Sequence, residues 1–342
     1  MFKRIYCVQR WAGVVAVAGL LVACVCPQLG HAASPVLTIR FSHVVATDTP
    51  KGLAVQRFQQ LVRERSEGTM AVVIYPRGQL YGDTDEVQAL QLGAVEMIAP
   101  SLSKFGRMGV PEFEIFDLPF LFRSTGDVAK ITKGPVGRQL LRKLERVQLL
   151  GLGYLDNGFK QMSANKPLLL PSDFVGLRMR VQSSHVIAAQ MSALGAQPVV
   201  LPFGDTQRAL AQQVVDGTEN PPSNFWTQGM NTVQSHFSLT QHGYIGYAVV
   251  TNPHFWAALS VSQRQLVKGA LADALAYGNA IAQQENDKSL QALRDAGTTQ
   301  IHTLSDDNRA ALRQAVQPAY DDLEQRIGNV WLDQVYKALR KH

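Results

Sequence analysis

Cysteine is almost missing from this sequence of 342 residues. It contains three cysteines, Cys7, Cys24 and Cys26, all within the first 26 residues. If the chain is cleaved after Ala33, as argued below, the remaining protein has none. That protein would have no disulfide bond, no thiolate metal site and no cysteine nucleophile. We therefore expect its stability to come from burial of an apolar core, for which about 309 residues are sufficient.

Charge of either sign is also scarce. Charged residues make up 18% of the sequence, which is low for a globular chain and argues against coiled coils and charge-driven scaffolds. The formal net charge of +6 includes Lys3, Arg4 and Arg10 from the first 33 residues, which carry no acidic residue. Without these three cations the net charge is +3. Because no basic stripe is present, we expect no nucleic-acid partner.

A long apolar run is lacking as well. The longest one extends from Trp11 to Cys26, 16 residues, whereas a membrane-spanning helix needs about 18 or more. Basic residues precede this run and small residues follow it, so residues 1–33 are predicted to be a signal peptide cleaved after Ala33 or Ala32. The expected location is the periplasm. The alternative is a lipoprotein, because residues 21–24 (LVAC) resemble a lipobox that would leave a lipidated Cys24.

Strand and helix patterns alternate along the rest of the chain, which predicts an α/β fold. Apolar runs predict strands at 36–41, 70–75, 95–99, 148–155, 177–181, 198–201 and 244–251. Helices are expected at 50–68, 85–93, 127–147 with a break at Gly134-Pro135, 184–195, 205–215, 263–294 and about 306–339. The helix at 263–294 is long enough to brace more than one unit. We expect two lobes with a cleft between them, where ligand sites tend to form.

The common motifs of enzymes are missing. Gly151-Leu152-Gly153 follows a strand, but the glycine spacing does not fit a dinucleotide site. No nucleophile elbow and no phosphate loop is found, and the histidines are too scattered for a zinc motif. We therefore expect no cofactor and no metal, and an enzyme is the weaker interpretation.

Six ordered stretches carry a specific resemblance. They are FSHV at 41–44 with TPKG at 49–52, SLSKFG at 101–106, NGFKQMSANKP at 157–167, GLRMRVQSS at 176–184, VDGTENP at 215–221, and residues 235–247. Together they resemble the DctP-type solute-binding proteins of tripartite ATP-independent periplasmic (TRAP) transporters, most closely the branch that binds C4-dicarboxylates. The resemblance covers nearly all of residues 36–340.

The resemblance implies a periplasmic binding protein fold with two α/β lobes that close on an organic acid. On this basis we assign residues 34–157 plus about 246–285 to lobe I, and residues 158–245 plus about 286–342 to lobe II. The expected ligand is a small carboxylate such as malate, succinate or fumarate. The expected partners are the small and large membrane subunits of the transporter.

The predicted binding side chains are mostly cations and amides. A carboxylate that leaves water needs charge-assisted hydrogen bonds, and a guanidinium matches its geometry. Arg178 and Arg180 lie on one face of a predicted strand, and the residues alone do not decide between them. The resemblance selects Arg180 as the carboxylate clamp and Asn220 as an amide donor beside it. It also selects Lys160 as a ligand contact, at a position where sialate-binding relatives carry an arginine.

A second carboxylate would be met by the first lobe. Its candidates follow predicted strands or start a helix, where open α/β sheets bind ligands: His43, Ser101, Lys51 and Lys104. The resemblance adds Phe203 as an aromatic contact, although Phe203-Gly204-Asp205 departs from the Phe-Ser-Glu of many relatives. Asn224 and Trp226 are further candidates for the cleft.

Three alternatives remain open from the sequence. In the first alternative, the ligand is a different carboxylate, such as a sugar acid, an aromatic acid or a longer dicarboxylate. Another alternative is a periplasmic enzyme, whose general base would be His43, His185 or His242. The third is a sensory protein that passes its closed state to a membrane receptor.

Overall fold

The computed structural model describes residues 36–340. The predicted signal peptide, its cleavage site and the alternative anchor at Cys24 lie outside these residues. Within the described range, no helix combines the length and the apolar character that are needed to cross a bilayer.

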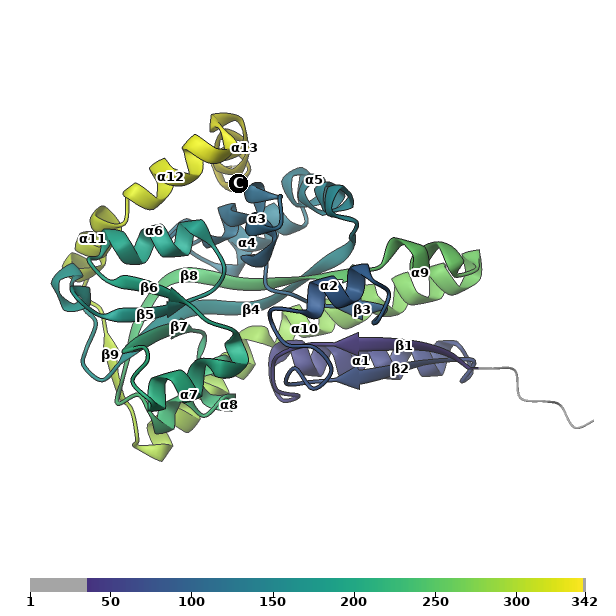
Figure 1. Cartoon of the computed structure of the whole chain (residues 1–342), viewed down its shortest axis with the longest axis horizontal. Coiled ribbons are helices and arrows are strands. Elements are labelled where there is room, and N and C mark those ends of the chain that lie inside the picture. Colours follow the sequence, from purple (N-terminus) through teal and green to yellow (C-terminus); the bar gives the residue numbers. More distant parts are fainter. Residues whose placement is uncertain (1–35, 341–342) are drawn as a thin grey trace, which may run out of the picture. The chain divides into compact units, whose positions relative to one another are not determined.

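One mixed sheet of nine strands forms the framework (Figure 1). The strands are β1 (Leu37–Ser42), β2 (Met70–Tyr75), β3 (Met97–Ile98), β4 (Leu150–Ala164), β5 (Arg178–Val181), β6 (Gln197–Val200), β7 (Gly217–Asn220), β8 (His236–Thr251) and β9 (Gln300–Thr303). Their order is β2-β1-β3-β8-β4-β7-β5-β6, and β9 pairs with β8. This confirms the predicted α/β class.

The sheet has two groups of parallel strands with a long antiparallel pair between them. We call β1, β2 and β3 the first half and β5, β6 and β7 the second half; strands within each group pair in parallel. β4 and β8 pair with each other along most of their length, with register shifts at Gly151/Gly153, Asp156/Gly158 and Lys160/Met162. β3 joins the first half to β8, and β7 joins the second half to β4. Figure 1 shows both long strands running from one half to the other.

The helices cover this sheet. They are α1 (Pro50–Arg65), α2 (Glu86–Gln91), α3 (Lys104–Arg107), α4 (Thr125–Thr132), α5 (Pro135–Lys143), α6 (His185–Ala193), α7 (Thr206–Ala211), α8 (Pro222–Thr227), α9 (Pro253–Ala258), α10 (Val261–Ala296), α11 (Asp306–Ala315), α12 (Pro318–Ile327) and α13 (Asn329–Arg340). Short 3₁₀ turns add η1 (Pro111–Asp117), η2 (Leu144–Val147), η3 (Pro171–Phe174), η4 (Phe203–Asp205) and η5 (Met230–Thr232).

The predicted long helix is confirmed as α10, which has 36 residues. Ser260 caps it in a reciprocal capping box with Gln263, and it ends at Gly297 in the left-handed region with a φ of 64°. Such caps satisfy the backbone groups that helix ends leave unpaired. α10 packs against α1, β4 and α8. Because α1 packs against β2 and α8 follows β7, the long helix braces the parts of the chain around both halves.

A close crossing explains one glycine in this long helix. A Cβ atom on Gly278 would lie 2.6 Å from Cδ1 of Leu155 on β4 and 2.7 Å from Cβ of Ala54 on α1. The absence of a side chain therefore lets α10 approach both elements at this point.

Several predicted boundaries were wrong. β4 and β8 are each longer than the predicted strands at 148–155 and 244–251, because polar residues at 156–164 and 236–243 disguise the rest of each strand. β3 has two residues where five were predicted. The last predicted helix is three helices, α11, α12 and α13, with Pro318 starting α12 and Gly328 following it at a φ of 76°. The predicted break at Gly134-Pro135 is confirmed, because α4 ends at Thr132 and α5 starts at Pro135; the end of that segment is the separate turn η2.

Apolar side chains form several cores around the sheet. The first half packs α1 and α10 around Phe41, Phe58, Val62 and Val267. The second half packs α6 around Phe174, Met179, Ile187 and Met191. A further core brings together side chains of η1, α5, β8 and the terminal helices α12 and α13, among them Phe116, Leu140, Val250, Leu323 and Leu332. The division of the chain into two lobes at the predicted residues stays a prediction.

Candidate functional site

Most of the predicted site residues lie at or just beyond the carboxyl ends of the short strands. His43 follows β1, and Ser101 and Lys104 follow β3. In the second half, Arg180 is on β5, Phe203 follows β6 and Asn220 ends β7. Two hydrogen bonds described below join the two groups, so the fold brings these motifs to one region (Figure 1).

Arg180 is buried without a carboxylate partner. The residue is 1% exposed. Its Nε and Nη2 both donate to the carbonyl oxygen of Leu201, at 3.0 and 2.8 Å. The guanidinium lies 5.8 Å from the ring centre of Phe203. Burial lowers the pKa of Arg180, and the charges of Asp83 and Glu219 oppose that shift. Within residues 36–340, no carboxylate accepts a hydrogen bond from this guanidinium.

The neighbouring Arg178 differs from Arg180 in having a carboxylate partner and in being exposed. Its Nη2 lies 2.7 Å from Oδ1 of Asp216, its Nε donates to Oδ2 at 3.1 Å, and its side chain is 41% exposed. Arg178 therefore has the features of a surface ion pair, whereas Arg180 remains available for an anion. The choice of Arg180 as the carboxylate clamp stays a prediction.

Lys160 is paired inside the protein. Its Nζ lies 2.7 Å from Oε1 of Glu219, and both side chains are at most 2% exposed. Oε2 of Glu219 lies 2.8 Å from Nε2 of His242, whose Nδ1 lies 2.7 Å from the hydroxyl of Thr240. Because an ionised carboxylate only accepts, Nε2 of His242 donates to Glu219 and Nδ1 accepts from Thr240 if the imidazole is neutral.

The charges of this group fit that assignment. Burial alone raises the pKa of Glu219, but the ammonium of Lys160 and the hydrogen bond from His242 outweigh it and bring the pKa to about 2. Burial lowers the pKa of His242. Glu219 is therefore ionised and holds Lys160 in place.

Lys51 is a second buried cation without a bonded carboxylate in the described part of the chain. It lies in the first turn of α1 and is 1% exposed. Its Nζ donates to the carbonyl oxygen of Ala99 at 2.9 Å and lies 3.7 Å from the ring centre of Tyr247. Burial lowers its pKa to about 7, although the charge of Glu86 opposes that shift; Lys104 acts in the same direction as burial. The ammonium is desolvated and would gain from a ligand anion.

His43 lies beside Lys51 and is fully buried. Neither Nδ1 nor Nε2 has a hydrogen-bond partner among the described residues. Burial, and then the charge of Lys51, lower its pKa to about 3, so the imidazole is neutral. Buried polar atoms are normally satisfied, and these two unpaired nitrogens suit a site that a polar ligand completes.

Lys104 lies between two carboxylates. Its Nζ is 2.5 Å from Oδ1 of Asp83 and 2.5 Å from Oε1 of Glu86. Burial alone raises the pKa of Asp83, but Lys104 and then Arg180 lower it below its usual value. Lys104 is therefore neutralised within the protein, in contrast to Lys51 and Arg180.

Hydrogen bonds connect the halves next to this group. Oδ2 of Asp83, in the loop after β2, accepts from the backbone N–H of Phe203 at 2.8 Å. Nε2 of Gln182, after β5, donates to Oγ of Ser101 at 2.9 Å. The structure thus holds the carboxyl ends of the two strand groups together.

The amide candidates lie on β7 and α8. Asn220 pairs across the sheet with Gln161 of β4, and its Nδ2 donates to Oγ1 of Thr218 at 3.3 Å. Asn224 is buried, and its Oδ1 has no partner among the described residues. Trp226 is half-buried and packs against the core of the second half that contains Phe203.

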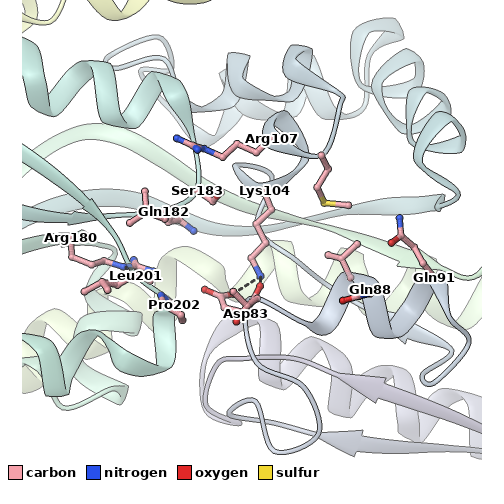
Figure 2. A pocket seen from close by; sticks show the side chains of 14 residues that line it. Asp83, Gln88, Gln91, Lys104, Arg107, Arg180, Gln182, Ser183, Leu201 and Pro202 are labelled. Atoms are coloured by element: carbon pink, nitrogen blue, oxygen red, sulfur yellow. Dashed lines mark hydrogen bonds and ion pairs between the residues drawn. The ribbon is translucent and has the colours of Figure 1, made fainter.

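A cavity of about 420 Å³ opens between the halves (Figure 2). Of the predicted site residues, Arg180 and Lys104 line it, together with Asp83, Gln182 and Leu201. The other eight predicted residues do not line this cavity. Asp83 and Glu219 were missed from the sequence, because an acidic residue in a loop or beside a turn has no local signal that separates a buried ion pair from a solvated surface.

Two strand groups with buried cations between them, braced by one long helix, define a solute-binding protein of α/β architecture. Comparison with known proteins makes this specific. The chain belongs to the bacterial extracellular solute-binding proteins, family 7 (DctP), whose family model matches residues 41–326. It is therefore a transport protein of a binding family and not an enzyme.

Its relatives are similar over nearly their whole length. The C4-dicarboxylate-binding periplasmic protein DctP of Rhodobacter capsulatus is 51% identical over 292 residues, which are 85% of this chain and 88% of that protein. A TRAP periplasmic solute-binding protein from Shewanella oneidensis, solved with bound succinate, is 40% identical with a TM-score of 0.87 over 89% of this chain and all of that chain. One from Pseudomonas aeruginosa, solved with bound L-malate, is 36% identical with a TM-score of 0.81 over 84% of this chain and 99% of the other.

Proposed function

We propose that this protein captures a C4-dicarboxylate, such as succinate, malate or fumarate, between its two halves. The observation that carries the proposal is the presence of two buried cations, Arg180 on β5 and Lys51 on α1, without a bonded carboxylate within residues 36–340. Arg180 belongs to the second half of the sheet, whereas α1, which carries Lys51, packs against β2 of the first half. A ligand with two carboxylates can satisfy both, whereas a monocarboxylate leaves one of them unpaired.

The surrounding side chains give each end of the ligand a different environment. Arg180 offers its planar guanidinium for a two-pronged contact with one carboxylate, and we place Asn220 and Phe203 beside that end. Lys51, the unpaired nitrogens of His43 and the hydroxyl of Ser101 suit the other carboxylate. Asn224, Trp226 and Lys104 are proposed to line the site.

Lys160 has a different place in this proposal. Because Glu219 already neutralises it, Lys160 contributes a hydrogen bond to the ligand rather than an uncompensated charge. The relatives solved with succinate and L-malate support the ligand class.

Ligand capture follows from the contacts across the cleft. A ligand that bonds to both halves binds the closed arrangement better than an open one, and only that difference can shift the population. Micromolar affinity would correspond to roughly −8 kcal/mol. The closed protein would then deliver its ligand to the small and large membrane subunits of a TRAP transporter.

A thermal-shift screen tests the ligand class. Succinate, malate and fumarate should each raise the melting temperature, and a monocarboxylate of the same length should not. A shift with a sugar acid, an aromatic acid or a longer dicarboxylate alone would replace the C4-dicarboxylate proposal by that alternative.

We also propose a periplasmic location after cleavage of residues 1–33. Mass spectrometry of the exported protein distinguishes the two alternatives. A chain that starts near Ser34 supports cleavage by signal peptidase, and a diacylated peptide that starts at Cys24 supports the lipoprotein.

A further inference from the structure

More cationic than acidic side chains line the cavity that Figure 2 shows. Three cationic side chains line it, Lys104, Arg107 and Arg180, and Asp83 is the acidic one. Asp83 and Glu86 already neutralise Lys104, and Asp83 also accepts the N–H of Phe203. The cations that remain for an incoming anion are therefore Arg107 and Arg180.

These two arginines differ in depth. Arg107 is exposed, and its side chain makes no hydrogen bond or ion pair with the residues that the structure describes, whereas Arg180 is 1% exposed. In Figure 2 the side chain of Arg107 extends from α3 toward Ser183, and Arg180 lies beside Leu201. One unpaired guanidinium thus marks the rim of the cavity and another marks its inner end.

The rim position of Arg107 is fixed by the packing of α3. Phe105 is completely buried, and a Cβ on Gly106 would lie 2.1 Å from Oε1 of Glu114. The helix is therefore held closely against η1, and Arg107 is the residue that it presents to solvent.

The rest of the rim is neutral. Gln88 and Gln91 of α2 and Gln182 and Ser183 after β5 line the cavity without adding charge. The acidic side chain of the lining, Asp83, is paired with Lys104. A dianion near this opening therefore meets the positive potential of Arg107. In a cleft with low-dielectric walls such a potential raises the local concentration of the ligand.

We propose that this cavity is the entry vestibule of the binding site and that Arg107 captures the dicarboxylate at its mouth before the ligand moves inward to Arg180. The inference rests on the proposed function, because it requires an anionic ligand. Arg107 acts on the approach of the ligand and does not contact it in the final complex. Its effect is therefore confined to the association rate constant.

Stopped-flow tryptophan fluorescence with succinate tests this role. At an ionic strength of about 20 mM, Arg107→Gln should lower the association rate constant about threefold to tenfold and leave the dissociation rate constant unchanged. At about 0.5 M salt the wild-type and variant rate constants should converge, because the charges are then screened. Arg107→Lys should keep the wild-type rate constant, since steering depends on charge and not on the shape of the guanidinium.

Arg63→Gln is the matched control. Arg63 is an exposed arginine of α1 that does not line the cavity, so this variant changes the net charge equally and should retain the wild-type association rate constant.

Three results would overturn the inference. Equal association rate constants in Arg107→Gln and Arg63→Gln would show that overall charge, and not the vestibule, attracts the ligand. A faster dissociation with unchanged association would place Arg107 on the bound ligand. A wild-type protein that does not respond to millimolar succinate would refute the proposed function itself, which is a distinguishable failure.

Discussion

The carboxylate of Asp83 accepts a hydrogen bond from the backbone N–H of Phe203, 120 residues further along the chain, at 2.8 Å. Asp83 follows β2 in the first half, and Phe203 follows β6 in the second half. The same carboxylate bonds to Lys104. Asp83 therefore links the two edges of the cleft.

Two variants of Asp83 separate this link from the charge of the carboxylate. Asp83→Asn loses the charge but keeps an acceptor for the N–H of Phe203, whereas Asp83→Ala loses both. In Asp83→Asn the hydrogen bond joins two neutral groups and contributes about 0.5–1.5 kcal/mol. We expect succinate to dissociate roughly five times faster from Asp83→Ala than from Asp83→Asn, as measured by stopped flow. Equal rates in the two variants would show that the hydrogen bond does not hold the closed arrangement.

Removing one member of the Lys160–Glu219 pair should destabilise the fold. Glu219→Gln leaves a buried ammonium without its partner, and Lys160→Met leaves a buried carboxylate, so each should lower the free energy of unfolding by about 3–5 kcal/mol. The double variant should lose less than the sum of the two, because neither charge remains. Urea unfolding of the four proteins gives the coupling energy, and strictly additive losses would argue against the pair.

Arg180→Ala should abolish the thermal shift produced by succinate. The carboxylate would enter a desolvated site without its guanidinium, a loss on the order of 3–5 kcal/mol of binding free energy. Arg178→Ala is the matched control, because Arg178 lies two residues away on the same strand but is bound to Asp216. Calorimetric titration should show near wild-type affinity for Arg178→Ala. Micromolar binding by Arg180→Ala would remove Arg180 from the site.

The affinity for succinate should fall as the pH rises above about 7. Lys51 has a pKa lowered to about 7 by burial, and a ligand carboxylate beside it favours the protonated form. Binding above this pH therefore takes up a proton, and the dissociation constant should rise about tenfold per pH unit until the pKa of the complex is reached. Calorimetry at pH 8 in buffers of different ionisation enthalpy measures this proton uptake. An affinity that is constant between pH 6 and 9 would place the ligand away from Lys51.

The same residue sets a pH dependence for the ligand-free protein. In the unfolded chain Lys51 keeps its proton up to the ordinary lysine pKa of 10.5, whereas in the folded protein it releases the proton near pH 7. Between these values the unfolded state holds more protons, so the contribution of Lys51 to stability increases as the pH rises. Lys51→Met should remove this slope from the free energy of unfolding, as followed by urea titrations at pH 7, 8 and 9.

The sequence predicted the fold class, the family and the long helix α10, because these depend on periodic patterns and on motifs that span the chain. It did not predict the full length of β4 and β8. Residues such as Lys160 and His242 are polar where a strand signal requires apolar side chains, and their burial becomes intelligible only once Glu219 is seen between them.

In the candidate site, too, the sequence predicts the residue types, whereas tertiary contacts decide which side chains are paired. The choice between Arg178 and Arg180 was open from the residues alone, and the structure separates the two side chains through Asp216, which lies 38 residues beyond Arg178 in the sequence. The neutralisation of Lys104 by Asp83 also depends on tertiary contacts. Roles in ligand binding stay predictions for all ten candidate residues.

The two halves share the backbone of β4 and β8 and the continuous helix α10. Neither half therefore has a complete set of strands of its own, and a cut at residue 157 would divide β4 and separate its first part from β8. We expect scanning calorimetry of the intact chain to show a single cooperative transition, with the calorimetric and van't Hoff enthalpies in agreement. A protein that opens and closes around its ligand would in this way unfold as one piece.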